Sequence, residues 1–381
     1  MITAATAAKV KELVSPGIYL RVQGGIEMKI VPTQRVDWPP PYKDATEKYS
    51  AQVRLSKDRR STIGYVAGQP FPLIDPNDPD VAVEIAWNNV FRPITSDDYD
   101  LRFFECNAHY ISRGKGTSLE LDDTEVGHYA GYSEVGRTEV EPMPVDPDFK
   151  STGRLWLFAL YPVIQPATQR GAGIVRFRYA DPKRGDDSWS YTVGARRVRR
   201  LNEAVLSDAT GISAWNPDHY SGFNPKTEAY DYKFLGEKQM LACVHAEHSP
   251  EIPCPTDGGA SACPEAWEYR HMYVLEAKPR YGIVNTLQGR NMLYMDSESL
   301  VRALCRHLRS ERRALPELHV PADRARSPGA RRQNSDLPVQ AFVRGRRVVA
   351  RLPVAAIQHV LPARTRDAGA RVLVHQYGCG G

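Results

Sequence analysis

Long apolar runs are missing from this 381-residue sequence. No window approaches the roughly 18 consecutive apolar residues that mark a membrane-spanning helix, which excludes an integral membrane protein of the helical kind. The opening residues, MITAATAAKVKELV, also lack the apolar core of a secretory signal peptide. We therefore expect either a cytoplasmic protein or a start codon that has been placed too late.

Signatures of common catalytic sites are missing as well. The sequence has no G-x-x-x-x-G-K-[ST] phosphate loop, no H-E-x-x-H, no G-x-S-x-G and no complete G-x-G-x-x-G. RRVRR (196–200) could hold phosphate but is more typical of a solvated strand end, and the acidic pair in RGDD (184–187) is typical of a turn. We expect no enzyme, no catalytic residues, no cofactor and no nucleic-acid partner.

Lysine is absent from the last part of the chain. Residues 299–381 contain 16 arginines, 5 acidic residues and no lysine, whereas residues 1–298 contain 34 basic and 40 acidic residues. The two net charges are therefore +11 and −6. A basic arm for nucleic acid normally carries aromatic residues for stacking, but residues 299–381 contain one Phe, one Tyr and no Trp.

Reading out of frame in GC-rich DNA explains this composition better, because shifted codons often become CGN, which encodes arginine. A back-translation of LVRALCRHLR (300–309), read one base later, permits W-F-V-P-Y-V-D-T-Y. The shifted reading restores the pattern of a strand, which the printed residues lack. We predict that residues 1–298 form a single domain and that residues 299–381 are an out-of-frame tail, disordered or non-native.

Four cysteines precede this tail, and three explanations of them stay open. Cys254 and Cys263 bracket the Gly-containing loop CPTDGGASAC, and a disulfide between them would require an oxidising compartment. They could instead be free thiols. A metal site is the third explanation, since Cys243, His245, His248, Cys254 and Cys263 lie within 21 residues. Their spacing matches no common zinc framework, so we predict the Cys254–Cys263 disulfide and no metal.

The residue pattern predicts an α+β protein with a large antiparallel sheet. We expect helices over 5–14, 43–53 and 76–90, the last capped by Asp80, and a strand within 17–31. Residues 120–150 are acidic and turn-rich, which is typical of a connector. The clearest strands form a meander, and others follow it: 154–164, 173–180, 188–193, 196–201, 232–244, 266–278 and 289–296.

The meander supplies the candidate binding residues. Its first strand is apolar on both faces, with Trp156 and Phe158 on one face, and such a strand needs cover on each side. In the next strand Phe177 and Tyr179 share one face, while the alternating arginines point the opposite way. A curved, aromatic sheet without a catalytic motif suits an apolar ligand. The residues that we expect to bind it are Trp156, Phe158, Phe177, Tyr179, Trp189 and Tyr191.

Several runs resemble one protein family. GYVAGQPFPLIDPNDP, WLFALYP, RFRYADPKRGDDSWSYTVGARRVRRL and EAWEYRHMYVLEA are similar to the proteobacterial family catalogued as domain of unknown function 1329, over nearly all of residues 15–298. That family is described as resembling the periplasmic lipoprotein-sorting carriers LolA and LolB. Those carriers have an unclosed antiparallel β-barrel whose concave apolar face holds acyl chains, with helices as a lid.

The resemblance implies a function as well as a fold. Members of the family normally carry a signal peptide and continue past position 298 with aromatic strands, and this chain has neither. No catalytic residues are established for the family. We therefore expect a periplasmic carrier or binding protein for a lipid or another hydrophobic molecule, linked to outer-membrane transport. The alternatives are a metal-assisted hydrolase built on the Cys/His cluster and a non-catalytic partner of an outer-membrane export system.

Overall fold

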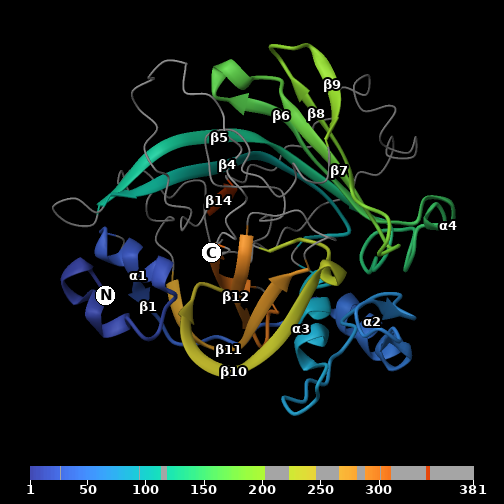
Figure 1. Ribbon diagram of the computed structural model, residues 1–381, viewed down its shortest axis with the longest axis horizontal. Helices are drawn as coiled ribbons and strands as arrows, with labels where there is room; N and C mark the ends of the chain where they lie inside the picture. The colour runs from blue at the N-terminus through green and yellow to red at the C-terminus, as the bar shows by residue number, and fades with distance from the viewer. Residues whose placement is uncertain are drawn as a thin grey trace, which may run out of the picture.

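Two curved sheets dominate the fold. The computed structural model describes residues 1–25, 27–93, 95–112, 118–201, 223–245, 266–280, 288–300, 302–309 and 340–343. In these residues one sheet has seven strands, another has five, and a third is a two-stranded ribbon. Figure 1 shows the seven-stranded sheet arching over the five-stranded sheet, with α1, α2 and α3 around the latter.

The seven-stranded sheet is antiparallel throughout. Its edge strands do not pair with each other in the described part of the chain, so the sheet curves without closing into a barrel. This confirms the predicted α+β fold with an unclosed curved sheet. The strands in spatial order are β14 (Gln340–Val343), β4 (Asp98–Ser112), β5 (Ser118–Ser133), β6 (Arg154–Gln165), β7 (Gly173–Tyr179), β8 (Asp187–Thr192) and β9 (Arg197–Leu201).

The five-stranded sheet is built around β11, which pairs with three other strands. The β1–β11 pair is parallel, and the remaining pairs are antiparallel. The strands are β1 (Lys29–Ile30), β10 (Tyr230–Ala242), β11 (Ala266–Pro279), β12 (Gln288–Asp296) and β13 (Arg302–Arg309). A separate ribbon joins β2 (Arg54–Leu55) to β3 (Thr62–Ile63).

The helices are short. None that the structure describes has the length and apolar character needed to cross a membrane. Asp80 precedes α3 as predicted, but its side chain makes no capping hydrogen bond and pairs with Arg59 instead. The helices are η1 (Ala4–Val10), α1 (Pro16–Gln23), α2 (Pro40–Tyr49), η2 (Ser50–Gln52), α3 (Val81–Val90), α4 (Phe149–Thr152), η3 (Ala167–Gln169) and η5 (Thr227–Ala229).

The strand predicted within residues 17–31 is wrong in its first part, because residues 17–23 belong to α1 and only β1 (Lys29–Ile30) is a strand. The Ser15 side chain accepts a hydrogen bond from the Ile18 amide, and Pro16 occupies the first helical position. Both are strong signals for the start of a helix. Ile18 and Val22, one helical turn apart, are buried on the same side. Burial at helical spacing outweighs the β-branched character of the segment.

The connector predicted over residues 120–150 is wrong in its first part. Residues up to Ser133 belong to β5, which pairs with β4 on one side and β6 on the other. Glycines and acidic residues give β5 a weak intrinsic preference for strand. Its two long neighbours supply the hydrogen bonds that hold it in the sheet. The strand therefore depends on tertiary pairing, which no local pattern reveals.

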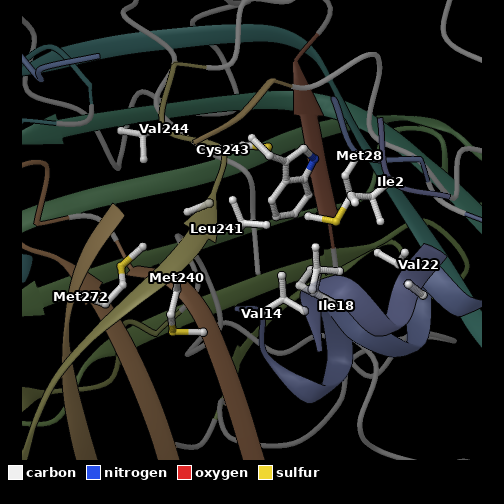
Figure 2. Packing of buried hydrophobic residues seen from close by; sticks show 14 of the residues in the cluster. Ile2, Val14, Ile18, Val22, Met28, Met240, Leu241, Cys243, Val244 and Met272 are labelled. Carbon is white, nitrogen blue, oxygen red and sulfur yellow. The ribbon is translucent and has the colours of Figure 1, made fainter. Parts of the chain in front are cut away.

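Helices cover the five-stranded sheet with two apolar cores. In the first, η1 and α1 place Val10, Ile18 and Val22 against β10 and β11 (Figure 2). In the second, α3 places Val81 and Ile85 against Leu275 and Leu293 of β11 and β12. Burial of such side chains contributes roughly 1.5–3 kcal/mol each. The apolar side chains of the five-stranded sheet are therefore covered by helices of the same chain.

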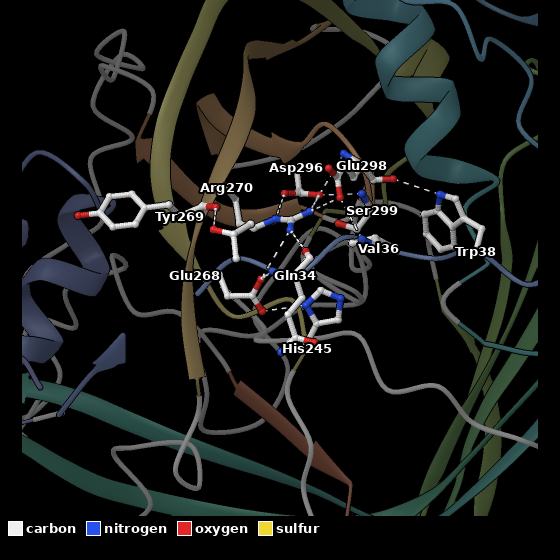
Figure 3. Close-up of polar contacts among 11 residues, drawn as sticks. Gln34, Val36, Trp38, His245, Glu268, Tyr269, Arg270, Asp296, Glu298 and Ser299 are labelled. Carbon is white, nitrogen blue, oxygen red and sulfur yellow. Dashed lines mark hydrogen bonds and ion pairs between the residues drawn. The ribbon is translucent and has the colours of Figure 1, made fainter. Parts of the chain in front are cut away.

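A strap (residues 31–38) crosses the same sheet and is held by a buried ionic network (Figure 3). Arg270 on β11 is buried and donates to Asp296, with Nε–Oδ2 2.7 Å, and to Glu298 at 3.0 Å. A third bond runs from Arg270 to the Gln34 carbonyl at 2.6 Å. The Gln34 amide in turn donates to the buried carboxylate of Glu268 at 2.8 Å. Charged side chains thus fix the backbone of the strap.

Candidate ligand-binding site

The register of β6 and β7 decides which side chains share a face of the seven-stranded sheet. Residues opposite each other in an antiparallel pair carry their side chains to the same side. Trp156 lies opposite Arg178, and Phe158 lies opposite Arg176. These four side chains occupy one face, which we call the Trp156 face. Leu157, opposite Phe177, belongs to the reverse face.

The structure does not bring all the predicted binding residues together. Trp156 and Phe158 lie on the Trp156 face and pack in one cluster. The other four lie on the reverse face. Phe177, Tyr179 and Trp189 pack there with Leu157. Tyr191 belongs to the same face because it is two residues from Trp189 in β8. Any one ligand would therefore meet only part of the predicted set.

Four aromatic side chains form a row along the Trp156 face. Ring centroids are 5.5 Å apart for Tyr99–Tyr129, 5.6 Å for Tyr129–Phe158 and 5.5 Å for Phe158–Trp156. Gly131 makes room for the first ring, because a Cβ at this position would lie 2.3 Å from the Tyr99 ring. Sequence reasoning missed both tyrosines, since it assigned no strand to residues 98–112 and placed Tyr129 in the connector predicted over residues 120–150.

A buried arginine pair ends the row. The Arg178 guanidinium lies 4.7 Å from the centroid of the Trp156 ring, a favourable cation–π distance. Arg178 and Arg176 both donate to one carboxylate, that of Asp186, at 2.8 and 2.7 Å. All three side chains are buried. Burial alone would raise the pKa of Asp186, but the two guanidiniums outweigh it and lower that pKa to about 2.

This ionic cluster was not predicted, although the sequence holds a signal for it. The sequence pattern led us to interpret Asp186 as a turn residue. It placed Arg176 and Arg178 on the other face of their strand from Phe177 and assigned them no partner. Arginine at two alternate positions of an otherwise apolar strand requires buried carboxylates or solvent on that face. Asp186, the first residue of the acidic pair, meets this need, because the hairpin of β7 and β8 brings it beside both arginines.

The reverse face is covered by polar side chains of its own sheet. Phe177 packs edge-on against Trp189 at 5.1 Å, and the Arg154 guanidinium lies 5.0 Å from the Phe177 ring. Arg184 lies over the Tyr179 ring at 3.3 Å, and the Tyr179 hydroxyl donates to Asp187 at 2.7 Å. Burial and Asp187 raise the pKa of Tyr179 to about 12. These contacts make the reverse face a packed layer.

The predicted cysteine and histidine sites fall mainly outside the described residues. Cys254, Cys263 and His248 lie there, so the predicted disulfide stays a prediction. Cys243 is buried in the core that η1 and α1 cover. His245 lies with Nδ1 2.7 Å from Oε1 of the buried Glu268. Within the ranges that the structure describes, no three His, Cys, Asp or Glu side chains are grouped as metal ligands would be.

A cavity of about 360 Å³ lies away from the Trp156 face. It opens between the segment that precedes α3 and the end of β12. One of its lining side chains, Leu73, is 90% exposed, and another, Leu300, is buried. None of the predicted binding residues lines it. Its full lining is Gln69, Pro72, Leu73, Ile74, Asp75, Tyr273, Ser297 and Leu300.

Three solved structures are similar to this chain. A DUF1329 family protein from Desulfovibrio piger has 17% identity and a TM-score of 0.38, with 60% of this chain and 71% of that one covered. A putative outer membrane lipoprotein-sorting protein domain from Vibrio parahaemolyticus has 14% identity, a TM-score of 0.38 and coverage of 61% and 73%. A LolA superfamily protein from Nitrosomonas europaea has 11% identity, a TM-score of 0.27 and coverage of 54% and 64%.

Sequence comparison identifies the family directly. No curated protein matches the chain. The profile described as protein of unknown function (DUF1329) matches residues 1–308. This match spans well over half of the chain and agrees with the family that the residue runs indicated. The chain belongs to the DUF1329 family.

Proposed function

We propose that this protein is a periplasmic carrier or binding protein for a lipid or another hydrophobic molecule, which it holds against the Trp156 face. The observation that carries the proposal is the row of four aromatic rings from Tyr99 to Trp156. Every described member of this cluster comes from the sheet itself. Helices pack on the apolar residues of the five-stranded sheet, whereas the described cluster of the Trp156 face, in which Tyr129 and Phe158 are buried, contains no helical residue.

The arginine pair gives the proposed site a polar end. Pockets for small molecules are mainly apolar, with a few fixed polar groups that orient the ligand. The Arg178 guanidinium is fixed by Asp186 and by Asn224, whose Oδ1 it meets at 3.2 Å. A ligand lying along the aromatic row would place one end beside this cation. An elongated apolar molecule with an acidic or polar head fits this arrangement.

The test is the binding of a fluorescent 18-carbon fatty acid to wild-type protein and to Trp156→Ser. If the indole covers roughly 100 Å² of ligand, its loss removes about 2.5 kcal/mol of binding. We expect the dissociation constant of Trp156→Ser to rise by about 70-fold. Its melting temperature should stay close to that of the wild type, because Trp156 is only partly buried.

Two control variants separate the alternatives. Phe177→Ala removes a buried ring of the reverse face and should destabilise the fold by roughly 3–5 kcal/mol without a selective loss of binding. Leu73→Ser alters the rim of the cavity at a residue that is 90% exposed. Loss of binding in Leu73→Ser but not in Trp156→Ser would move the ligand to the cavity. A wild-type protein that binds no apolar probe would end the carrier hypothesis.

The periplasmic location and the non-catalytic role belong to the same proposal and are supported by membership of the family. Two other functions have their own tests. Stoichiometric zinc in purified protein, lost in Cys254→Ser, would favour the metal-assisted hydrolase. A stable protein partner from the outer membrane, purified without lipid, would favour a role in an export system.

A further inference from the structure

The hairpin of β8 and β9 stands out within residues 1–298 by its charge. Residues 192–200 are all exposed, and they include Arg196, Arg197, Arg199 and Arg200. No acidic residue occurs from Ser188 to Leu201. Residues 1–298 as a whole have a net charge of −6. A compact positive patch on a domain of opposite net charge directs that part of the molecule toward anionic surfaces. Residues 299–381 add a net charge of +11 that wild type and variants share.

The hairpin is also amphipathic. Val198 lies opposite Tyr191, and Arg199 lies opposite Ser190. Because side chains alternate along a strand, Val198 and Tyr191 share one side, while Arg197 and Arg199 share the other. Val198 is 66% exposed and Val193, in the turn, is 37% exposed. Val198 thus projects into solvent on one side of the hairpin, and Arg197 and Arg199 project on the other.

The ion pairs of the hairpin leave most of this charge available. Arg200 pairs with Asp187, which also meets Arg184 and the Tyr179 hydroxyl. For Arg197 and Arg199 the described residues supply no carboxylate within ion-pairing distance. Both strands are fixed in register by the sheet, so the guanidiniums are held together on one edge.

We propose that the β8–β9 hairpin docks the protein on an anionic phospholipid surface. Arginines that reach phosphate while neighbouring apolar side chains enter the interface are the pattern of proteins that lie on membranes. The proposal goes beyond the ligand carried on the Trp156 face. A carrier must approach a membrane to collect or deliver lipid, but docking itself requires no bound ligand and is measured separately.

A structural explanation of the same arginines competes with this one. β9 is the outermost described strand of its sheet, and charged residues on edge strands prevent sheets from pairing with one another. Glutamate would serve that purpose as well as arginine. Docking on anionic lipid, however, requires positive charge. Charge reversal therefore separates the two explanations.

The experiment is co-sedimentation of the full chain with phosphatidylcholine vesicles, with or without about 30% phosphatidylglycerol. We expect the wild type to bind only the anionic vesicles, and less at high salt. Each cation near such a surface contributes on the order of fivefold to partitioning. The R197E/R199E variant should therefore bind at least about 25-fold more weakly, and Val198→Ser several-fold more weakly.

A matched control is the K9E/K11E variant, which makes the same change of net charge at two exposed lysines near the N-terminus. It should bind the anionic vesicles like the wild type. Thermal melting verifies that each variant is folded. Equal binding by R197E/R199E and wild type would overturn the proposal. So would equal binding of the wild type to both kinds of vesicle, or a preference for DNA or heparin over anionic vesicles at the same salt.

Discussion

Two arginines that share one buried carboxylate lie at the end of the aromatic row on the seven-stranded sheet. Arg176 and Arg178 alternate along β7 and so point to one side, and Asp186 reaches them from the following turn. Buried charges are tolerated only when they are paired and hydrogen-bonded. The carboxylate of Asp186 is therefore needed for folding as well as for the orientation of Arg178 over Trp156.

The stability of the protein should depend on pH through Asp186. Its pKa is lowered to about 2 in the folded protein, against about 4 in an unfolded chain. The contribution, roughly 2–3 kcal/mol, is fully present above pH 4 and is lost as the pH falls from about 4 to about 2. Urea unfolding at pH 7 and pH 3 should show about half of this loss in the wild type, because pH 3 lies midway between the two pKa values.

Asp186→Asn should remove that pH dependence and lower the free energy of unfolding at pH 7 by roughly 3–5 kcal/mol, because it takes the shared carboxylate from two buried guanidiniums. The matched control is Asp44→Asn, the same change at an exposed position on α2. Asp44→Asn should have little effect at either pH. Equal unfolding curves for the two variants would contradict the role given to Asp186.

Which residues share a face could be predicted within each strand but not between strands. Alternation correctly predicted that Phe177 and Tyr179 share one face of β7 and that Arg176 and Arg178 share the other face. It could not say whether Trp156 or Leu157 would lie opposite Phe177. A shift of one residue in the pairing of β6 and β7 would move every side chain to the other face. Register comes from turns and core packing, which the local pattern does not contain.

At the scale of elements, strong local patterns predicted the structure well. The strands predicted over 154–164, 173–180 and 266–278 appear as Arg154–Gln165, Gly173–Tyr179 and Ala266–Pro279. The prediction failed where local signals were weak or opposed. β5 contains glycines and acidic residues and is held by its neighbours, whereas α1 contains β-branched residues and is held by its cap and buried face.

The strap (residues 31–38) depends on Arg270 for the hydrogen bonds that hold its backbone. Arg270→Met keeps an unbranched side chain but leaves Glu268 and Asp296, both buried, without their cation. We expect the free energy of unfolding to fall by roughly 3–5 kcal/mol. Hydrogen exchange should rise first at Gln34, because its amide donates to Glu268 and its carbonyl accepts from Arg270.

Arg290→Met is the matched control for this change. The Arg290 side chain is 50% exposed and pairs with Glu276 near the surface, and exposed ion pairs contribute about 1 kcal/mol or less. The strap should exchange at the wild-type rate in this variant. If Arg270→Met and Arg290→Met lower the free energy of unfolding equally, the network in Figure 3 does not anchor the strap.

At the scale of the whole molecule, residues 299–381 differ most in composition from the rest of the chain. β13 (Arg302–Arg309) extends the five-stranded sheet, and the family match ends at residue 308. We propose that residues 1–298 are the domain and that residues 299–381 are read out of frame. An excess of arginine with no lysine is the expected product of shifted GC-rich codons, whereas an edge of a sheet calls for alternating apolar residues.

Resequencing of the locus should therefore reveal one extra base near the codons for Ser299 and Leu300, or a disrupted gene. The corrected chain would continue with a run such as W-F-V-P-Y-V-D-T-Y, whose aromatic and β-branched residues have a stronger preference for strand than the printed arginines. Mass spectrometry of the native protein gives an independent check. Tryptic cleavage of the printed sequence releases ALPELHVPADR, and detection of that peptide in the organism would show that the tail is translated as written.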